Sequence, residues 1–411
     1  MALSRYAEAE QLLRPHFHPE LIGLSEMWLL MHTLALNYAL CLIKTGCPLD
    51  AENICRRLED RTGKPSEFYV NFSLALLNGR KWTEAVEVCK HGLDSFPTDA
   101  DIQGNLTISL ANSGDLDSAS DSAIKRIKLR RDIHGIEEAA GILQRQAAAK
   151  RDTDLPGAIA VAKVVGDLIE EGIALNPRFY PILLKQIQLR RFAHDESTVL
   201  SLCQVMIDAD DCPPVYRQSA FAEMVEKLSE GKSFATALDL IQRSGHGESE
   251  RLLAVKMRTL ARHYMIGKEN VKGQRIIVPE VREYFLKIAS RHNDCNSVIA
   301  AEILDWMGDS KRALEVLDQY LSTTPTDWDG VRVSALIHLR MGKHERALHL
   351  ARSLITVAPW RAESYDWLRY VAQQVKKPDI AGQAKQRGDE VFEKENMLFV
   401  DLRAYLDTKC A

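Results

Sequence analysis

The chain has 411 residues, 27% of them charged, and a formal net charge of −4. This near-neutral balance excludes a strongly basic or acidic surface as the main determinant of partner choice, and a hydrophobic content of 46% excludes a wholly disordered chain. Plentiful Ala and Leu, with only 7% aromatic residues, favour helices over strands.

The N-terminal segment MALSRYAEAEQLLRPHF lacks the apolar core of a signal peptide. The segment HFHPE, residues 16–20, offers two His and one Glu, but its prolines favour a helix-end loop over a metal site. None of the eight cysteines forms a C-x-x-C pair, and most lie in apolar helical patterns, which is typical of reduced, buried thiols. We therefore expect a cytoplasmic protein.

The most apolar stretch, residues 27–43, is at the short limit for a membrane span. It contains His32, Thr33 and Asn37, which are costly in lipid. We predict a buried helix here and no membrane span.

A 34-residue period runs through the first third of the chain and returns near its end. In each unit a Gly ends the first helix, because Gly readily adopts the left-handed conformation. The Ala five residues later is small enough for two helices to cross closely, and a Pro stops the second helix. The matched sets are Asn37, Asn71 and Asn105; Ala51, Ala85 and Ala119; Ala313, Ala347 and Ala381; Gly308 and Gly342; and Pro325 and Pro359.

Units with these Gly, Ala and Pro positions resemble tetratricopeptide repeats (TPR). The clearest copy is FYVNFSLALLNGRKWTEAVEVCKHGLDSFPTD, residues 68–99, where Gly79 comes one residue early, so we expect its turn to differ by one residue. The resemblance implies an all-α fold, a TPR-like α-solenoid in which antiparallel helix hairpins form a right-handed superhelix. Stacked hairpins would bury a continuous core and leave a concave surface suited to binding.

We predict four parts in the chain. Residues 1–132 form an N-terminal TPR array that starts with a half repeat, which indicates either an atypical cap or a piece of a longer protein. Residues 133–292 form divergent TPR-like hairpins, with Ala158 and Ala237 at the small-residue position and a loop near 266–279. Residues 293–392 form a C-terminal TPR array, and residues 393–411 form a capping helix.

The repeated asparagines are the candidate partner-binding residues. Asn37, Asn71 and Asn105 occupy equivalent places on the first helix of successive units. An amide can donate to and accept from a peptide backbone, and in some TPR proteins an asparagine ladder on the concave face holds an extended peptide. The alternative is that Asn is simply common at this position. The equivalent C-terminal residues, Ile299, Val333 and Trp367, are apolar.

A basic segment, KRIKLRR, provides a second candidate surface for an acidic partner or nucleic acid. Because it has no interleaved aromatic residue and the chain is net acidic, we interpret it as a solvated helix face. The alternatives are an acidic peptide partner and regulatory binding of nucleic acid, which the net charge disfavours. Its basic residues are Lys125, Arg126, Lys128, Arg130 and Arg131.

No motif for chemistry is evident. Phosphate loops, dinucleotide fingerprints and nucleophile elbows are missing from the sequence. The segment HERALH does not match a zinc-protease helix, because His344 and His349 are five residues apart instead of four. We predict no enzyme activity, no cofactor and no metal site.

The sequence favours a non-catalytic protein–protein interaction scaffold or adaptor that binds a partner polypeptide, or an extended peptide segment of it, in the concave TPR groove. An alternative is the regulatory or substrate-binding arm of a larger enzyme of kinase or glycosyltransferase type. The identity of the partner and the oligomeric state stay open.

Overall fold

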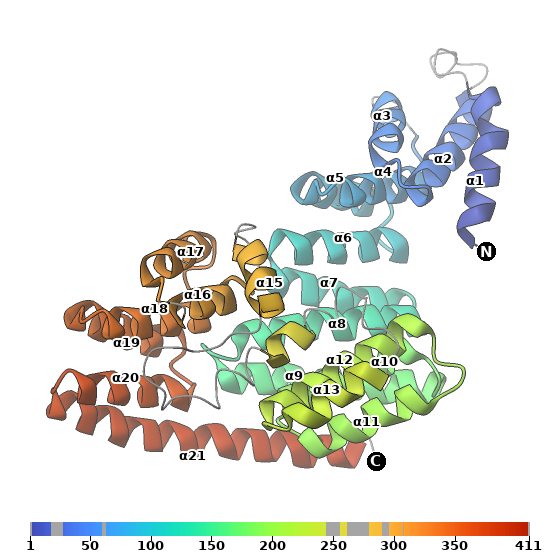
Figure 1. Ribbon diagram of the computed structural model, residues 1–411. Coiled ribbons are helices and arrows are strands. Elements are labelled where there is room, and N and C mark those ends of the chain that lie inside the picture. Colours follow the sequence, from blue (N-terminus) through green and yellow to red (C-terminus); the bar gives the residue numbers. More distant parts are fainter. Residues whose placement is uncertain are drawn as a thin grey trace. The chain divides into compact units, whose positions relative to one another are not determined.

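The computed structural model describes residues 2–17, 28–59, 63–243, 255–260, 279–289, 296–306 and 308–409. In these ranges every regular element is helical, and consecutive helices pack as hairpins joined by short turns (Figure 1). The predicted all-α fold is confirmed. The chain divides into two compact units, residues 1–146 with 174–176 and residues 147–173 with 177–411. The first unit thus extends beyond the boundary expected at residue 132.

Unit 1 contains the helices of the first hairpins, and the last of these helices crosses its boundary. They are α1 (Ala2–Leu13), the 3₁₀ turn η1 (Arg14–His16), α2 (Trp28–Lys44), α3 (Pro48–Glu59), α4 (Ser66–Asn78), α5 (Trp82–Ser95), α6 (Ala100–Ser113), α7 (Leu116–Leu129) and α8 (Ile133–Lys150).

Unit 2 contains the remaining helices. They are α9 (Leu155–Leu175), α10 (Tyr180–Phe192), α11 (Glu196–Asp208), α12 (Pro214–Glu230), α13 (Phe234–Arg243), α15 (Pro279–Ala289), α16 (Asn296–Trp306), α17 (Ser310–Thr323), α18 (Trp328–Arg340), α19 (His344–Val357), α20 (Ala362–Gln374) and α21 (Pro378–Lys409).

Most of the described hairpin turns contain one residue in the left-handed region, and the α8–α9 turn, residues 151–154, contains none. Gly46, Gly114, Gly308 and Gly342 have φ between +74° and +95°, as their place in the repeat predicts. In the α4–α5 turn Gly79 has φ −78° and the next residue, Arg80, takes φ +59°. The expected one-residue difference in this turn is confirmed.

Three other hairpins place a non-glycine residue in the left-handed region. His194, Lys232 and Lys376 have φ of 56–62° in the α10–α11, α12–α13 and α20–α21 turns. L-residues adopt this conformation at some cost. The same turn is therefore built without the glycine that marks it in sequence.

The small-residue positions lie where hairpin helices cross. Five of the six repeated alanines are fully buried and Ala381 is 7% exposed. In the middle segment Ala158 and Ala237 are also fully buried, which confirms their predicted place. The first helices of successive hairpins pack directly on one another, α2 on α4 and α4 on α6 in unit 1. Their shared core includes the buried rings of Phe68 and Phe72.

The C-terminal helix α21 is continuous from Pro378 to Lys409. The boundary expected at residue 392 falls inside this helix, since the surrounding EVFEKEN segment contains no helix breaker. The last turns of α21 pack against α9 and α10 of the same unit. Arg190, 3% exposed, donates to the Leu406 carbonyl at 2.9 Å and pairs with Asp407 at 2.5 Å and Asp195 at 3.0 Å.

Some predictions lie outside the described residues, namely the loop at 266–278, residues 18–20 of HFHPE, Cys295 and part of the Cys410 tail.

Among the described cysteines, five are buried and Cys47 is exposed, and all are free thiols. Burial raises the pKa of Cys55 to about 12, which keeps the thiol protonated. In the described part of the chain no helix combines the length and apolar character that a bilayer crossing requires.

Candidate functional site

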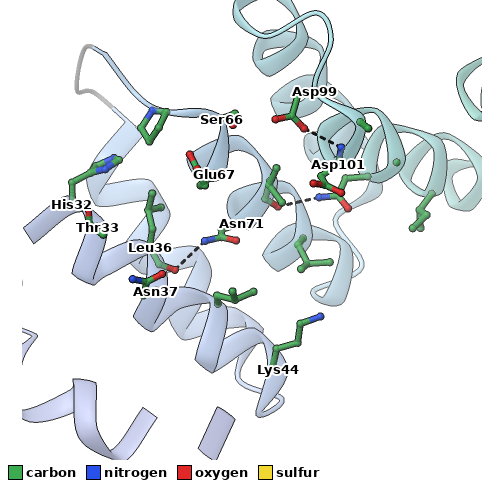
Figure 2. A pocket seen from close by; sticks show the side chains of 18 of the residues that line it. His32, Thr33, Leu36, Asn37, Lys44, Ser66, Glu67, Asn71, Asp99 and Asp101 are labelled. Atoms are coloured by element: carbon green, nitrogen blue, oxygen red, sulfur yellow. Dashed lines mark hydrogen bonds between the residues drawn. The ribbon is translucent and has the colours of Figure 1, made fainter. Parts of the chain in front are cut away.

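The first helices of three successive hairpins, α2, α4 and α6, line a groove of about 1030 Å³ in unit 1 (Figure 2). Side chains from α7 and α8 complete its lining. All three predicted asparagines lie in this groove, so the structure brings them together as the repeat register implies. Asn37 is exposed, Asn105 is half-buried and Asn71 is buried.

The asparagine amides tie neighbouring hairpins together. Asn71 Nδ2 donates to the Leu36 carbonyl of the preceding hairpin at 2.9 Å, and Asn105 Nδ2 donates to the Val70 carbonyl at 3.0 Å. Each bond spans 35 residues, so the repeat produces it twice. Asn105 Nδ2 also donates to Ser73 Oγ at 2.9 Å, so both N–H groups of Asn105 are used within the protein, whereas Asn71 uses one of its two.

The acceptor half of these amides stays available. No donor in the described part of the chain reaches Oδ1 of Asn71 or Asn105. A peptide N–H can use such an oxygen, and a peptide carbonyl can use the second N–H of Asn71, for which the described residues provide no acceptor. Asn105 can therefore only accept from a bound peptide, whereas the prediction that an amide both donates and accepts stays a prediction for Asn37 and Asn71.

An apolar floor runs beside the asparagine row. Leu40, Val70, Leu74 and Ile108 line the groove and are half-buried, so each keeps part of its side chain in contact with solvent. Covering such surface releases about 25 cal/mol per Å². The floor can therefore stabilise a bound aliphatic side chain.

Carboxylates gather where the inner helices begin. Glu67 is in the first turn of α4, and Asp101 is in the first turn of α6 next to its N-cap, Asp99 (Figure 2). Asp99 Oδ1 accepts the N–H groups of Asp101 at 2.9 Å and Ile102 at 3.0 Å. Carboxylates here also stabilise the positive end of the helix dipole. Lys44, exposed, lies at the opposite side of the groove, at the end of α2.

Arg126 lies almost buried at the α8 end of the groove. Its guanidinium occupies the space that a side chain on Gly135 would need, since a Cβ there would lie 1.4 Å from Nη1. It contacts Asp132 at 3.5 Å and Glu138 Oε2 at 4.0 Å. These long contacts leave Arg126 and Glu138 weakly paired.

Glu138, from α8, carries the most perturbed carboxyl of the groove. Burial raises its pKa to about 7, more than the nearby Arg126 lowers it. Its Oε1 is buried and accepts no hydrogen bond among the described residues. A donor brought to this oxygen would therefore satisfy a polar atom that the folded chain leaves unmatched.

The basic segment does not act as one patch. Arg126 turns into the groove, whereas Arg130 pairs with Asp101 at 3.2 Å and with Asp132 at 3.2 Å. Lys125, Lys128 and Arg131 are exposed. These residues are adjacent in the sequence, but α7 places Arg126 on a different face from Lys125 and Lys128, and Arg130 and Arg131 follow the end of the helix.

The C-terminal residues equivalent to the asparagines pack in or against the hydrophobic core of unit 2. Val333 is 1% exposed, and Ile299 is half-buried against the same cluster. Trp367 packs against the buried cluster that contains Trp328, whose indole donates to Ser364 Oγ at 2.9 Å. Trp328 and Trp367 therefore pack in the core. Among the described residues, no three His, Cys, Asp or Glu side chains are placed to hold a metal ion.

Comparisons with known proteins bear on the fold. No protein-family model matches the sequence, and no curated protein matches it. The APC/C hetero-tetramer Cut9–Hcn1 matches over 95% of this chain and 77% of that chain, with 12% identity and a TM-score of 0.50. A monomeric mutant of IFIT1 with Gppp-AAAA matches over 87% and 90%, with 12% identity and a TM-score of 0.51. Both neighbours are TPR-type helical repeat proteins.

The fold is a TPR-like α-solenoid. The neighbours share the hairpin architecture, and the resemblance to tetratricopeptide repeats is supported at the level of fold.

Proposed function

We propose that this chain is a non-catalytic scaffold that holds an extended segment of a partner protein in the groove of α2, α4 and α6. The observation that carries the proposal is the row of asparagine oxygens beside an apolar floor, repeated over successive hairpins. A row of acceptors at repeat spacing can bind backbone N–H groups of many sequences. The floor adds affinity by covering aliphatic side chains.

A second class of ligand, single-stranded RNA, is disfavoured by charge. The IFIT1 structure contains Gppp-AAAA. In the present groove four carboxylates (Glu67, Asp99, Asp101 and Glu138) face two cations (Lys44 and Arg126). Phosphates require an excess of positive charge for counterion release. An acidic groove therefore suits a polypeptide better.

The experiment selects peptides from a random-sequence phage library on the full chain and measures their affinity for two variants by fluorescence anisotropy. Leu74→Lys puts bulk and charge onto the groove floor, and we expect it to reduce affinity at least about tenfold, or about 1.4 kcal/mol. Leu49→Lys is the matched control, because Leu49 is 62% exposed on α3 and does not line the groove.

Circular dichroism and thermal unfolding confirm that both variants fold. If the selected peptides bind Leu74→Lys as tightly as the parent chain, the groove is not the binding site. If the library yields no binder and an oligoadenylate of about twenty nucleotides binds instead, the proposed ligand class is wrong.

A further inference from the structure

Resting on the proposed function, we infer that the groove of unit 1 selects an extended peptide with a Lys or Arg at about every third position. Three observations lead there: carboxylates on successive inner helices, an unmatched carboxylate oxygen on Glu138, and a floor that takes aliphatic residues.

Glu67 and Asp101 lie 34 residues apart, one repeat, and Glu138 lies three residues beyond the next equivalent position, Gly135. Glu67 lies on α4, Asp101 on α6 and Glu138 on α8, so each successive inner helix adds one acid to the groove. Glu67 is exposed and makes no hydrogen bond or ion pair with the described residues. Asp101 already pairs with Arg130. The two ends of the row, Glu67 and Glu138, therefore have the greatest capacity for a new cation.

The packing distance typical of neighbouring helices matches the repeat of one peptide conformation. Packed helices lie about 8–10 Å apart. A polyproline II segment rises about 3.1 Å per residue with three residues per turn, so every third side chain points the same way at about 9 Å intervals. Basic residues at every third position would then meet successive inner helices, and the positions between them would face the apolar floor and the asparagine oxygens.

Glu138 adds selectivity for a cation over a neutral donor. Its side chain lines the α8 end of the groove and is 25% exposed, and the long contact between Oε2 and Arg126 leaves the carboxylate incompletely compensated. An ammonium or guanidinium group would supply both a hydrogen bond and the opposite charge, which together are stronger than a neutral hydrogen bond. A peptide carboxylate would instead be repelled.

Fluorescein-labelled peptides of twelve residues test the inference. The first repeats Lys-Pro-Val four times, the second repeats Glu-Pro-Val, and the third contains the residues of the first with its lysines consecutive. We expect the first to bind at least about tenfold more tightly than the second and several-fold more tightly than the third, with affinity that rises as salt is lowered.

Two variants connect the preference to the groove. Glu67→Gln and Glu138→Gln should each weaken the lysine peptide about two- to fivefold and leave the glutamate peptide unaffected or slightly tighter. Glu87→Gln is the matched control, because Glu87 is exposed on α5 outside the groove. Its affinity for the lysine peptide should equal that of the parent chain.

The outcomes separate the two proposals. If library-selected peptides bind in the groove but lysine and glutamate peptides bind equally, the charge preference is wrong and the scaffold proposal stands. If the consecutive-lysine peptide binds as well as the spaced one, the three-residue register is wrong. If no peptide of any kind binds the parent chain, both proposals fail.

Discussion

Replacing Asn71 by alanine should lower the free energy of unfolding of unit 1 by about 1–2 kcal/mol. The side chain is 7% exposed and donates to the Leu36 carbonyl at 2.9 Å. Losing one such hydrogen bond costs about 0.5–1.5 kcal/mol. The Leu36 carbonyl keeps its partner within helix α2, so its full desolvation penalty is not incurred. The missing amide also leaves a small space in a packed position, which accounts for the upper end of the range.

Asn37→Ala is the matched control, since Asn37 has the same place in the repeat but is exposed and donates to no described residue. Its stability should stay within about 0.5 kcal/mol of the parent chain. Urea unfolding followed by far-UV circular dichroism gives the midpoint of each variant, and an unchanged m-value shows that the two can be compared.

Equal midpoints for the two variants would refute the structural role of the amide bond. The comparison also matters for binding experiments. A triple alanine variant of the row would combine a loss of stability at Asn71 and Asn105 with any loss of peptide affinity, whereas Asn37→Ala reports on binding alone.

Three further predictions concern stability. Arg190→Met should lower the free energy of unfolding by about 3–5 kcal/mol, because it leaves the nearly buried Asp195 without its cation. Arg178→Met, at an 80% exposed side chain, should lower it by less than about 1 kcal/mol, and equal urea midpoints for the two variants would contradict this. Gly92→Ala should lower the free energy of unfolding by about 1–3 kcal/mol, because a Cβ there would lie 2.8 Å from Tyr69 Cβ. In Gly382→Ala the new Cβ meets nothing within 4 Å, so thermal melts should show a neutral or stabilising effect. Burial raises the pKa of Glu138 from 4.5 to about 7, so between these pH values the folded chain binds more protons than the unfolded chain, and the free energy of unfolding falls as pH rises. Glu138→Gln should remove about 1–3 kcal/mol of this decrease between pH 5 and pH 8, and a pH profile of stability equal to that of the parent chain would refute the prediction.

Hairpins could be predicted from the sequence where the backbone conformation of the turn requires a particular residue. Gly46 and Gly114 mark turns that need a positive φ, and glycine is the residue that adopts it at least cost. The middle hairpins lacked this mark because His194 and Lys232 take the same conformation. Their place was visible only through small residues such as Ala158, which the helix crossing requires.

The sequence also indicates the full extent of the last helix, although the predicted boundary at residue 392 lies inside it. The residues around 392 are ordinary helix formers, and propensity alone would have continued the helix from Pro378 to Lys409. The packing of its last turns against α9 and α10 could not be predicted from the sequence, because Arg190 and Asp407 are 217 residues apart and no local pattern relates them.

By itself the sequence determined the period, the all-α fold and the alignment of Asn37, Asn71 and Asn105 along one face, because each of these depends on residues close together in the chain or repeated at a fixed step. Only the tertiary structure decided what those side chains do. The directions of the Asn71 and Asn105 amides depend on carbonyls 35 residues away, and the place of Arg126 depends on the missing side chain of Gly135. Burial and hydrogen bonding are properties of neighbours in space, which a repeat period does not specify.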